Sequence, residues 1–152
     1  MSKIIILGRP HPMIVESMKE FMERNGYEPF AISKIQDLKN IPHTGKVHGA
    51  VISTAVKSVV KESYIEVFQE IRKLYPDLPV LFATIGNAES MAKILSLTLS
   101  KIIKDSVLYI ADHNTQLNNL NLKKTFLIIN RENINAPEYK EISDNILKTF
   151  FS

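Results

Sequence analysis

The sequence has no cysteine and no tryptophan, and its 5 glycines and 7 prolines are scattered along the chain. Without cysteine the chain forms no disulfide, offers no thiolate nucleophile and holds no cysteine-ligated zinc. The lack of disulfides fits a cytoplasmic protein. Long apolar runs are also missing. The run at residues 4–8 is too short for a signal peptide or a membrane span, and the others are interrupted by charged residues. We therefore expect a cytoplasmic protein without a membrane segment.

Several motifs of cofactor-binding proteins and enzymes are absent as well. Neither GxGxxG nor GxxxxGK[ST] occurs, so the dinucleotide and P-loop classes lose their main support. Ser53 lacks the Gly-x-Ser-x-Gly context of a nucleophile elbow. The 4 histidines show no ligand spacing on a helix. We expect no cofactor, no metal and no catalytic residues, and the sequence favours a protein that is not an enzyme.

Charge gives only a weak indication about partners. The 19 basic residues against 16 acidic ones leave a net charge of +3. The lysines are spaced singly and alternate with Glu and Asp along predicted helices, which indicates solvated faces and argues against a nucleic-acid surface. At 152 residues the chain fits one domain, residues 1–152.

Apolar segments alternate with amphipathic helical patterns. The segments at 47–54 and 78–85 are apolar almost throughout, which is typical of central parallel strands covered on both faces. Further strands are predicted at 3–7, 29–33 and 126–130, and helices at 12–25, 35–40, from Ser58 to Leu74, from Asn87 onward and from Pro137 to Phe150. This alternation predicts an α/β fold with a doubly wound, mostly parallel sheet, helices on both faces and an extra C-terminal βα unit.

Two interpretations remain open after Asn87. In one, the fifth strand is Lys101 to Ile103, with Lys104 at its end. In the other, a long helix runs to about Lys104 and the strand is residues 107–111, which strand propensity favours slightly.

Candidate binding residues follow the predicted strands. Ligands of open parallel sheets collect outside the carboxyl ends of the strands. The residues found there are Arg9 and His11 after the first strand, Ser53 after the third, Thr84 and Asn87 after the fourth, and Lys104 after the fifth in the first interpretation. Arg9, Lys104 and the hydroxyl groups of Ser53 and Thr84 would converge beside helix N-termini. The arrangement predicts recognition of a phosphate, a carboxylate or an acidic side chain of a partner protein.

Residues 3–119 resemble the receiver domain of response regulators, a flavodoxin-like fold of the chemotaxis-regulator type. The segment LPVLFAT, residues 78–84, is similar to the receiver's fourth strand, and Thr84 stands at its characteristic Thr or Ser. The segment KIIK, residues 101–104, is similar to the fifth strand with its terminal Lys104. The resemblance makes residues 120–152 a C-terminal strand and helix extension.

The same comparison shows departures at the positions that bind phosphate and metal in the family. Arg9 and Pro10 replace the acidic pair that holds Mg²⁺, Ser53 replaces the phosphoacceptor Asp, and Asp105 replaces the Pro that follows the lysine. The resemblance therefore implies a degenerate pseudo-receiver that is not phosphorylated by the usual aspartyl route. We predict a non-enzymatic signalling module that binds a protein partner or a second copy of itself. The alternative is a flavodoxin-like binder of a small anionic ligand, or an enzyme acting on one, at the same edge.

Overall fold

The computed structural model describes all residues except 1, 43–44, 113–114, 116, 118–119 and 139. Its strands form one sheet, and every neighbouring pair of strands is parallel. The order in the sheet is β2-β1-β3-β4-β6-β5. The strands are β1 (Ser2–Arg9), β2 (Tyr27–Ala31), β3 (Gly45–Ser53), β4 (Val80–Thr84), β5 (Val107–Ile110) and β6 (Thr125–Asn130).

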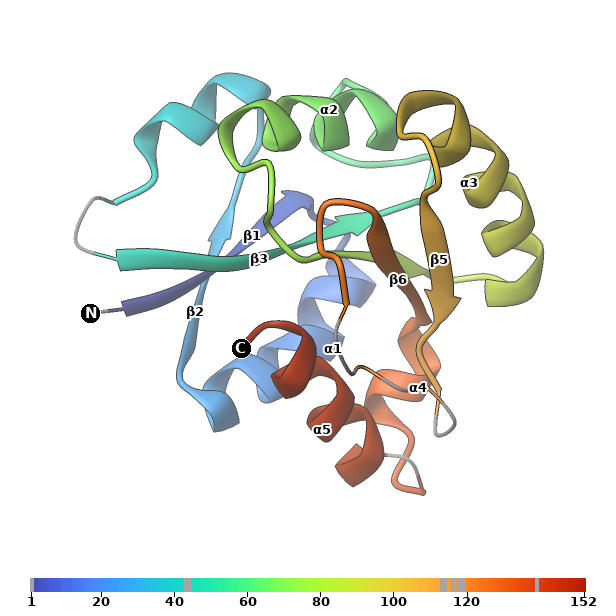
Figure 1. Cartoon of the computed structure of the whole chain (residues 1–152). Coiled ribbons are helices and arrows are strands. Elements are labelled where there is room, and N and C mark those ends of the chain that lie inside the picture. Colours follow the sequence, from blue (N-terminus) through green and yellow to red (C-terminus); the bar gives the residue numbers. More distant parts are fainter. Residues whose placement is uncertain (1, 43–44, 113–114, 116, 118–119, 139) are drawn as a thin grey trace.

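Helices cover both faces of this sheet (Figure 1). One face carries α1 (Pro12–Asn25), α4 (Arg131–Asn135) and α5 (Lys140–Phe150). The other face carries the 3-10 helix η1 (Ile35–Asn40), α2 (Tyr64–Leu74) and α3 (Ala88–Ile102). The predicted doubly wound α/β fold is confirmed. Among the described residues, no helix has the length and apolar character needed to cross a membrane.

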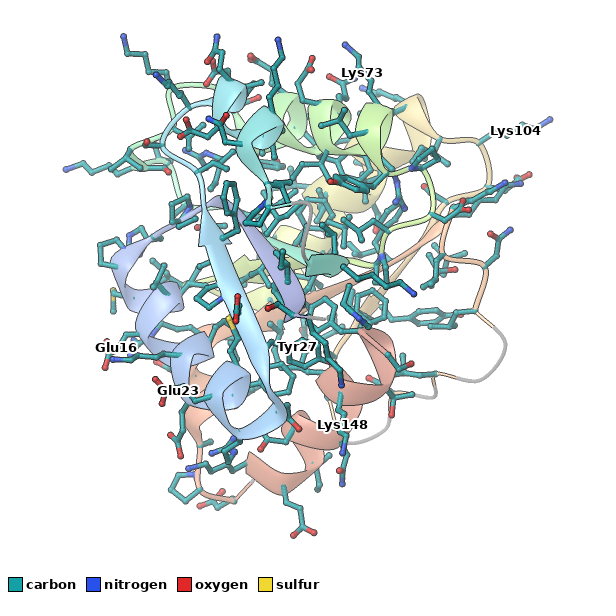
Figure 2. The ribbon with its side chains drawn as sticks, turned by 90° about the vertical axis from the view of Figure 1, so that its left-hand side faces the viewer. Glu16, Glu23, Tyr27, Lys73, Lys104 and Lys148 are labelled. Carbon is teal, nitrogen blue, oxygen red and sulfur yellow. The ribbon has the colours of Figure 1, made fainter. Side chains whose placement is uncertain are left out.

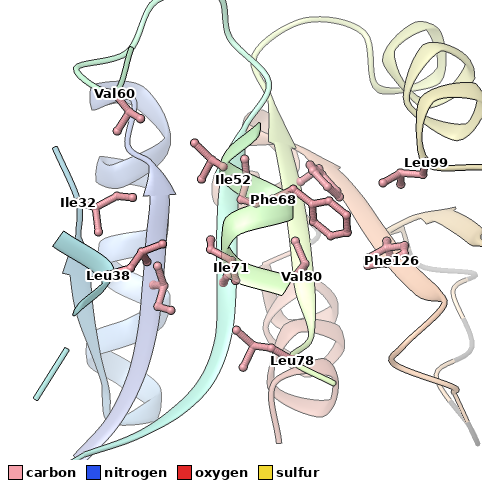
Figure 3. Close-up of a cluster of buried hydrophobic side chains, with 14 of the residues drawn as sticks. Ile32, Leu38, Ile52, Val60, Phe68, Ile71, Leu78, Val80, Leu99 and Phe126 are labelled. Carbon is pink, nitrogen blue, oxygen red and sulfur yellow. The ribbon is translucent and has the colours of Figure 1, made fainter. Parts of the chain in front are cut away.

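Each face of the sheet has its own hydrophobic core. On the face of α2 and α3, the rings of Phe68 and Phe126 meet edge to face with centroids 5.3 Å apart, and Leu99 is fully buried (Figure 3). On the opposite face, α1 and α5 contribute Met18 and Leu147, both with no exposed surface. The continuous apolar runs at β3 and β4 follow from this burial on both sides.

The second interpretation of the region after Asn87 is confirmed, and the first is wrong. Helix α3 continues to Ile102 because Leu95 and Leu99, four residues apart, are both buried against the sheet. The β-branched residues near its end therefore stay helical despite their strand propensity. The chain turns at Asp105, which has φ 62°, and then enters β5.

The C-terminal segment does more than extend the sheet at its edge. Strand β6 lies between β4 and β5, with Leu81 of β4 opposite Leu127 of β6 and Val107 of β5 opposite Thr125 of β6. Flavodoxin-like sheets have the order 2-1-3-4-5. Here β6 takes the place beside β4, and β5 is added at the edge.

Candidate functional site

The carboxyl ends of β1 and β3 lie side by side at the centre of the sheet. Arg9 is the last residue of β1, and Ser53 is the last residue of β3. Arg9 is opposite Ile52 in the register of the two strands. Because β1 and β3 are neighbours in the sheet, Arg9 and Ser53 lie close together. These are the two positions at which the sequence departs most from the receiver pattern.

The Arg9 side chain is buried and binds the loop that follows β3. Its Nη1 donates hydrogen bonds to the carbonyl oxygens of Ser53 at 3.1 Å and Ala55 at 2.5 Å, and its Nη2 donates to that of Val56 at 3.1 Å. Only 5% of the residue is exposed. Three carbonyl oxygens thus accept hydrogen bonds from one guanidinium, and these bonds connect the end of β1 to this loop.

The surroundings of Arg9 contain no opposing carboxylate among its described hydrogen-bond partners. Burial lowers the pKa of Arg9, and the nearby Tyr64 partly opposes this effect. Burial also raises the pKa of Tyr64, with Arg9 acting in the opposite direction. The guanidinium is charged in any case, since arginine does not deprotonate in proteins. The charge of Arg9 is therefore balanced by carbonyl dipoles.

Ser53 also serves the loop. Its side chain is almost completely buried, and its Oγ accepts a hydrogen bond from the N–H of Ala55 at 3.1 Å. From the other side, Ser58 Oγ donates to the carbonyl oxygen of Pro10 at 3.2 Å. These bonds hold residues 54–63 in an irregular conformation. Helix α2 consequently begins at Tyr64, capped by Ser63, and the predicted start near Ser58 is wrong.

Thr84 lies at the end of β4, where its register partner is Asn130 at the end of β6. Asn130 Oδ1 accepts from the N–H of Glu132 at 2.8 Å, and its Nδ2 donates to the carbonyl oxygen of Gly86. The structure thus adds Asn130 to this edge. The sequence prediction found the strand 126–130 but not its place, because strand order is not readable from a strand's own residues.

His11 and Asn87 are helix caps. His11 Nδ1 accepts from the N–H of Met13 at 3.3 Å at the start of α1. Asn87 Oδ1 accepts from the N–H of Ser90 at 2.9 Å at the start of α3. Both side chains lie at the carboxyl edge as predicted, and both satisfy N–H groups of a first helical turn there.

Lys104 does not join these residues. Helix α3 carries the chain from the carboxyl end of β4 back to the side of the sheet where the strands begin. Lys104 therefore lies shortly before the amino end of β5. Its side chain is exposed and extends away from the molecule (Figure 2). The predicted convergence of Lys104 with Arg9, Ser53 and Thr84 is therefore wrong, because it depended on placing the fifth strand at 101–103.

The chemistry of this edge follows from the residues that end the four inner strands, which are Arg9, Ser53, Thr84 and Asn130. None is a carboxylate, the group that hard cations such as Mg²⁺ require. Within the described part of the chain, no group of three or more His, Asp or Glu side chains is arranged to hold a metal ion. His43 and His113 lie outside the described residues.

Comparison with solved structures shows a likeness to the crystal structure of a response regulator receiver domain protein from Clostridium thermocellum. The alignment covers 99% of this chain and 94% of that chain, with a TM-score of 0.53 and 15% sequence identity. No protein-family model and no curated protein sequence matches the chain. The likeness shows a receiver fold, here with one additional strand in an all-parallel sheet.

Proposed function

We propose that this receiver-like domain is a signalling module that acts by binding protein and is not controlled by aspartyl phosphorylation. The observation that carries the proposal is the position of the Arg9 guanidinium, which is enclosed by the carbonyl oxygens of Ser53, Ala55 and Val56. In the family resemblance, this is the place of the acidic residues and their Mg²⁺. A built-in cation occupies the surroundings in which a metal ion would otherwise act.

Electrostatics supports this part of the proposal. A divalent cation near Arg9 would be repelled by the guanidinium, in surroundings where burial reduces screening by water. Ser53 offers a hydroxyl where a carboxylate nucleophile would be needed, and that hydroxyl is buried and hydrogen-bonded to the loop. Phosphoryl transfer by the family's route therefore lacks both its nucleophile and its metal ligands.

Exposed apolar side chains support the protein-binding part. Large hydrophobic residues are exposed on helix α3, namely Ile94, Leu97 and Ile102, and on the neighbouring strand β5, namely Val107 and Tyr109, whose side chains point to the sheet face opposite α3. Leu97 is 68% exposed. Apolar residues gathered on one surface mark contact sites more often than scattered ones do.

The alternative function, binding of a small anion at the carboxyl edge, has less support. The predicted form of this site has two cationic side chains, Arg9 and Lys104, that converge on one ligand. Arg9 is engaged by three carbonyl oxygens, and Lys104 lies at the opposite edge of the sheet.

The phosphorylation claim is tested on the purified chain with Mg²⁺ and acetyl phosphate. We expect no added phosphoryl mass in the intact-mass spectrum and no change in melting temperature. A receiver domain with its acidic pair and phosphoacceptor Asp, treated in parallel, is the positive control. A stoichiometric phosphoryl adduct on this chain would overturn the proposal.

The binding claim is tested by cross-linking and mass spectrometry with the substitution Leu97→Glu. Val59→Glu is the matched control, because Val59 is also strongly exposed, at 67%, but lies in the loop before α2. We expect cross-linked protein, whether a second copy or another chain, to be lost with Leu97→Glu and kept with Val59→Glu. Equal recovery with both variants would contradict the proposed face.

A further inference from the structure

The two edges of the sheet differ in how they are protected. At the β2 edge, the N–H of Ile32 donates to the carbonyl oxygen of Leu7 in β1. Backbone groups of successive strand residues point to alternate sides, so the backbone nitrogen of Pro29 points away from β1. Proline has no N–H to offer there, and the neighbouring Glu28 is exposed and charged. The β5 edge, with the sequence VLYI, contains neither a proline nor a charged residue. Of the two edge strands, as far as their own described residues go, β2 carries the usual protection against pairing with another chain and β5 does not.

The backbone of β5 has hydrogen-bonding groups that point away from the sheet. Val107 and Ala111 donate their N–H groups to carbonyl oxygens of the neighbouring β6 chain, both at 2.8 Å. Successive residues of a strand point their backbone groups to alternate sides. Leu108 and Ile110 therefore direct their N–H groups toward the open edge.

We infer that a second copy of this chain pairs with β5 in antiparallel orientation, on a two-fold axis that passes beside Leu108. The inference rests on the proposed protein-binding role and names the partner as an identical subunit. In this register Leu108 exchanges both backbone hydrogen bonds with Leu108 of the partner subunit. The N–H of Ile110 donates to the carbonyl oxygen of the partner's Ser106, and the symmetric bond forms on the other side.

The remaining backbone groups agree with this register. The N–H of Ser106 already bonds to the carbonyl oxygen of Ile103 at 3.3 Å. The carbonyl oxygen of Ile110 already accepts from Thr115 Oγ1 at 2.8 Å. These two groups would otherwise face each other across the interface, so the pairing satisfies the open groups and leaves the others in their internal bonds.

The exposed side chains of β5 are complementary to themselves in this arrangement. Val107 is 41% exposed and Tyr109 is 44% exposed, and both lie on the same face of the strand. The register places Val107 directly opposite Tyr109 of the partner subunit, and Tyr109 opposite the partner's Val107. A β-branched residue opposite an aromatic one is a favourable cross-strand pair.

Residues of opposite charge flank β5. Lys104 lies four residues before Leu108, and Asp112 lies four residues after it. Both residues are exposed. The antiparallel orientation therefore brings the end of one β5 strand that carries Lys104, next to Asp105, toward the end of the other that carries Asp112.

Helix α3 leaves room for the partner. Ile102 lines the hollow between α3 and α2 together with Arg72, so this side of α3 faces α2. Residues Ala92, Ser96 and Ser100, spaced by four, lie on a different side of the helix from Ile102. Small side chains there permit the α3 helices of two subunits to approach closely above the joined sheets.

Sedimentation velocity over a concentration series, using the full chain, tests the inference. We expect the wild type to dimerise. The variant with Val107→Lys and Tyr109→Lys puts two lysine pairs across the interface and should weaken dimerisation by about tenfold or more, equivalent to about 1.4 kcal/mol. The variant with Val107→Lys and Tyr109→Glu should dimerise again, because lysine then faces glutamate. Circular dichroism checks that both variants fold, and Val59→Lys is the distant control.

Cysteine cross-linking checks the register, since the chain has no cysteine of its own. An equimolar mixture of the Val107→Cys and Tyr109→Cys variants should form disulfide-linked pairs of one variant with the other, and each variant alone should not. A wild type that stays monomeric, or loss of dimer in both charge variants alike, would overturn the inference. A monomer that also remains unphosphorylated would leave the proposed absence of aspartyl control intact.

Discussion

The ring of Phe151, which follows α5, occupies the space that a Cβ atom at Gly49 of β3 would need. Phe151 is fully buried, and its carbonyl oxygen lies 3.0 Å from Nδ1 of His48. The absence of a side chain at Gly49 thus allows the aromatic residue to pack directly on the central strand.

Gly49→Ala should displace this ring and lower the free energy of unfolding by about 1–3 kcal/mol. Phe151→Ala should cost about 3–5 kcal/mol by leaving a cavity. In the Phe151→Ala background, Gly49→Ala should cost less than about 1 kcal/mol, because the clash has been removed. Urea denaturation of the four proteins of this cycle measures the coupling, and additive costs would contradict the contact.

Arg9→Met should destabilise the protein by about 3 kcal/mol, because it removes the donor to three carbonyl oxygens that are turned inward. Limited proteolysis should then cleave the loop at residues 54–63 faster than in the wild type. Lys104→Met, a similar change at an exposed position, should stay within about 0.5 kcal/mol of the wild type. Equal stability of the two variants would show that the Arg9 hydrogen bonds are not needed.

Asp105→Gly should stabilise the protein by about 0.5–1 kcal/mol, because the backbone there has φ 62°, which glycine adopts without strain. Asp105→Asn removes the charge but keeps a residue that tolerates this conformation, so its stability should stay near the wild type. Asp105→Ala should be the least stable of the three. Thermal unfolding of the set separates backbone strain from charge.

The pKa of Asp37 should lie below that of an ordinary aspartate. The backbone N–H of Ser33 donates to its carboxylate and has the largest effect, and the Ser33 hydroxyl and Lys34 N–H also donate. A carboxyl with a depressed pKa stabilises the fold fully above the unfolded pKa of about 4, and this stabilisation is lost as pH falls through the folded value. Carbon-detected NMR titration gives the pKa directly. Asp37→Asn should flatten the acid limb of the stability profile.

Local pattern was sufficient to predict the fold class. The apolar runs of β3 and β4 and the periodicity of α1 reflect burial on one or two sides, which each segment's own residues encode. The choice at residues 101–111 was open because the Ile102–Ile103 pair favours a strand, whereas the burial of Leu95 and Leu99 favours a helix. Packing against Phe126, distant in the sequence, decided it in favour of the helix.

The site was predicted only in part, for a similar reason. Arg9 and Ser53 were found because strand ends are readable, but the function of Arg9 depends on carbonyl oxygens, which no side-chain pattern reveals. Lys104 was misplaced with its strand. Asn130 was missed because nothing in residues 125–130 states that β6 lies beside β4.

The placement of β6 inside the sheet also constrains how the chain can fold during synthesis. A ribosome releases β5 before β6 has been made, and β6 is the strand that pairs with β5 in the described part of the chain. Until residue 130 has emerged, the edge of β4 stays open and β5 has no position to occupy. The nascent domain therefore cannot add its strands in chain order. The part of the sheet formed by β4, β6 and β5 must instead form in one late step, which depends on contacts between residues distant in the sequence.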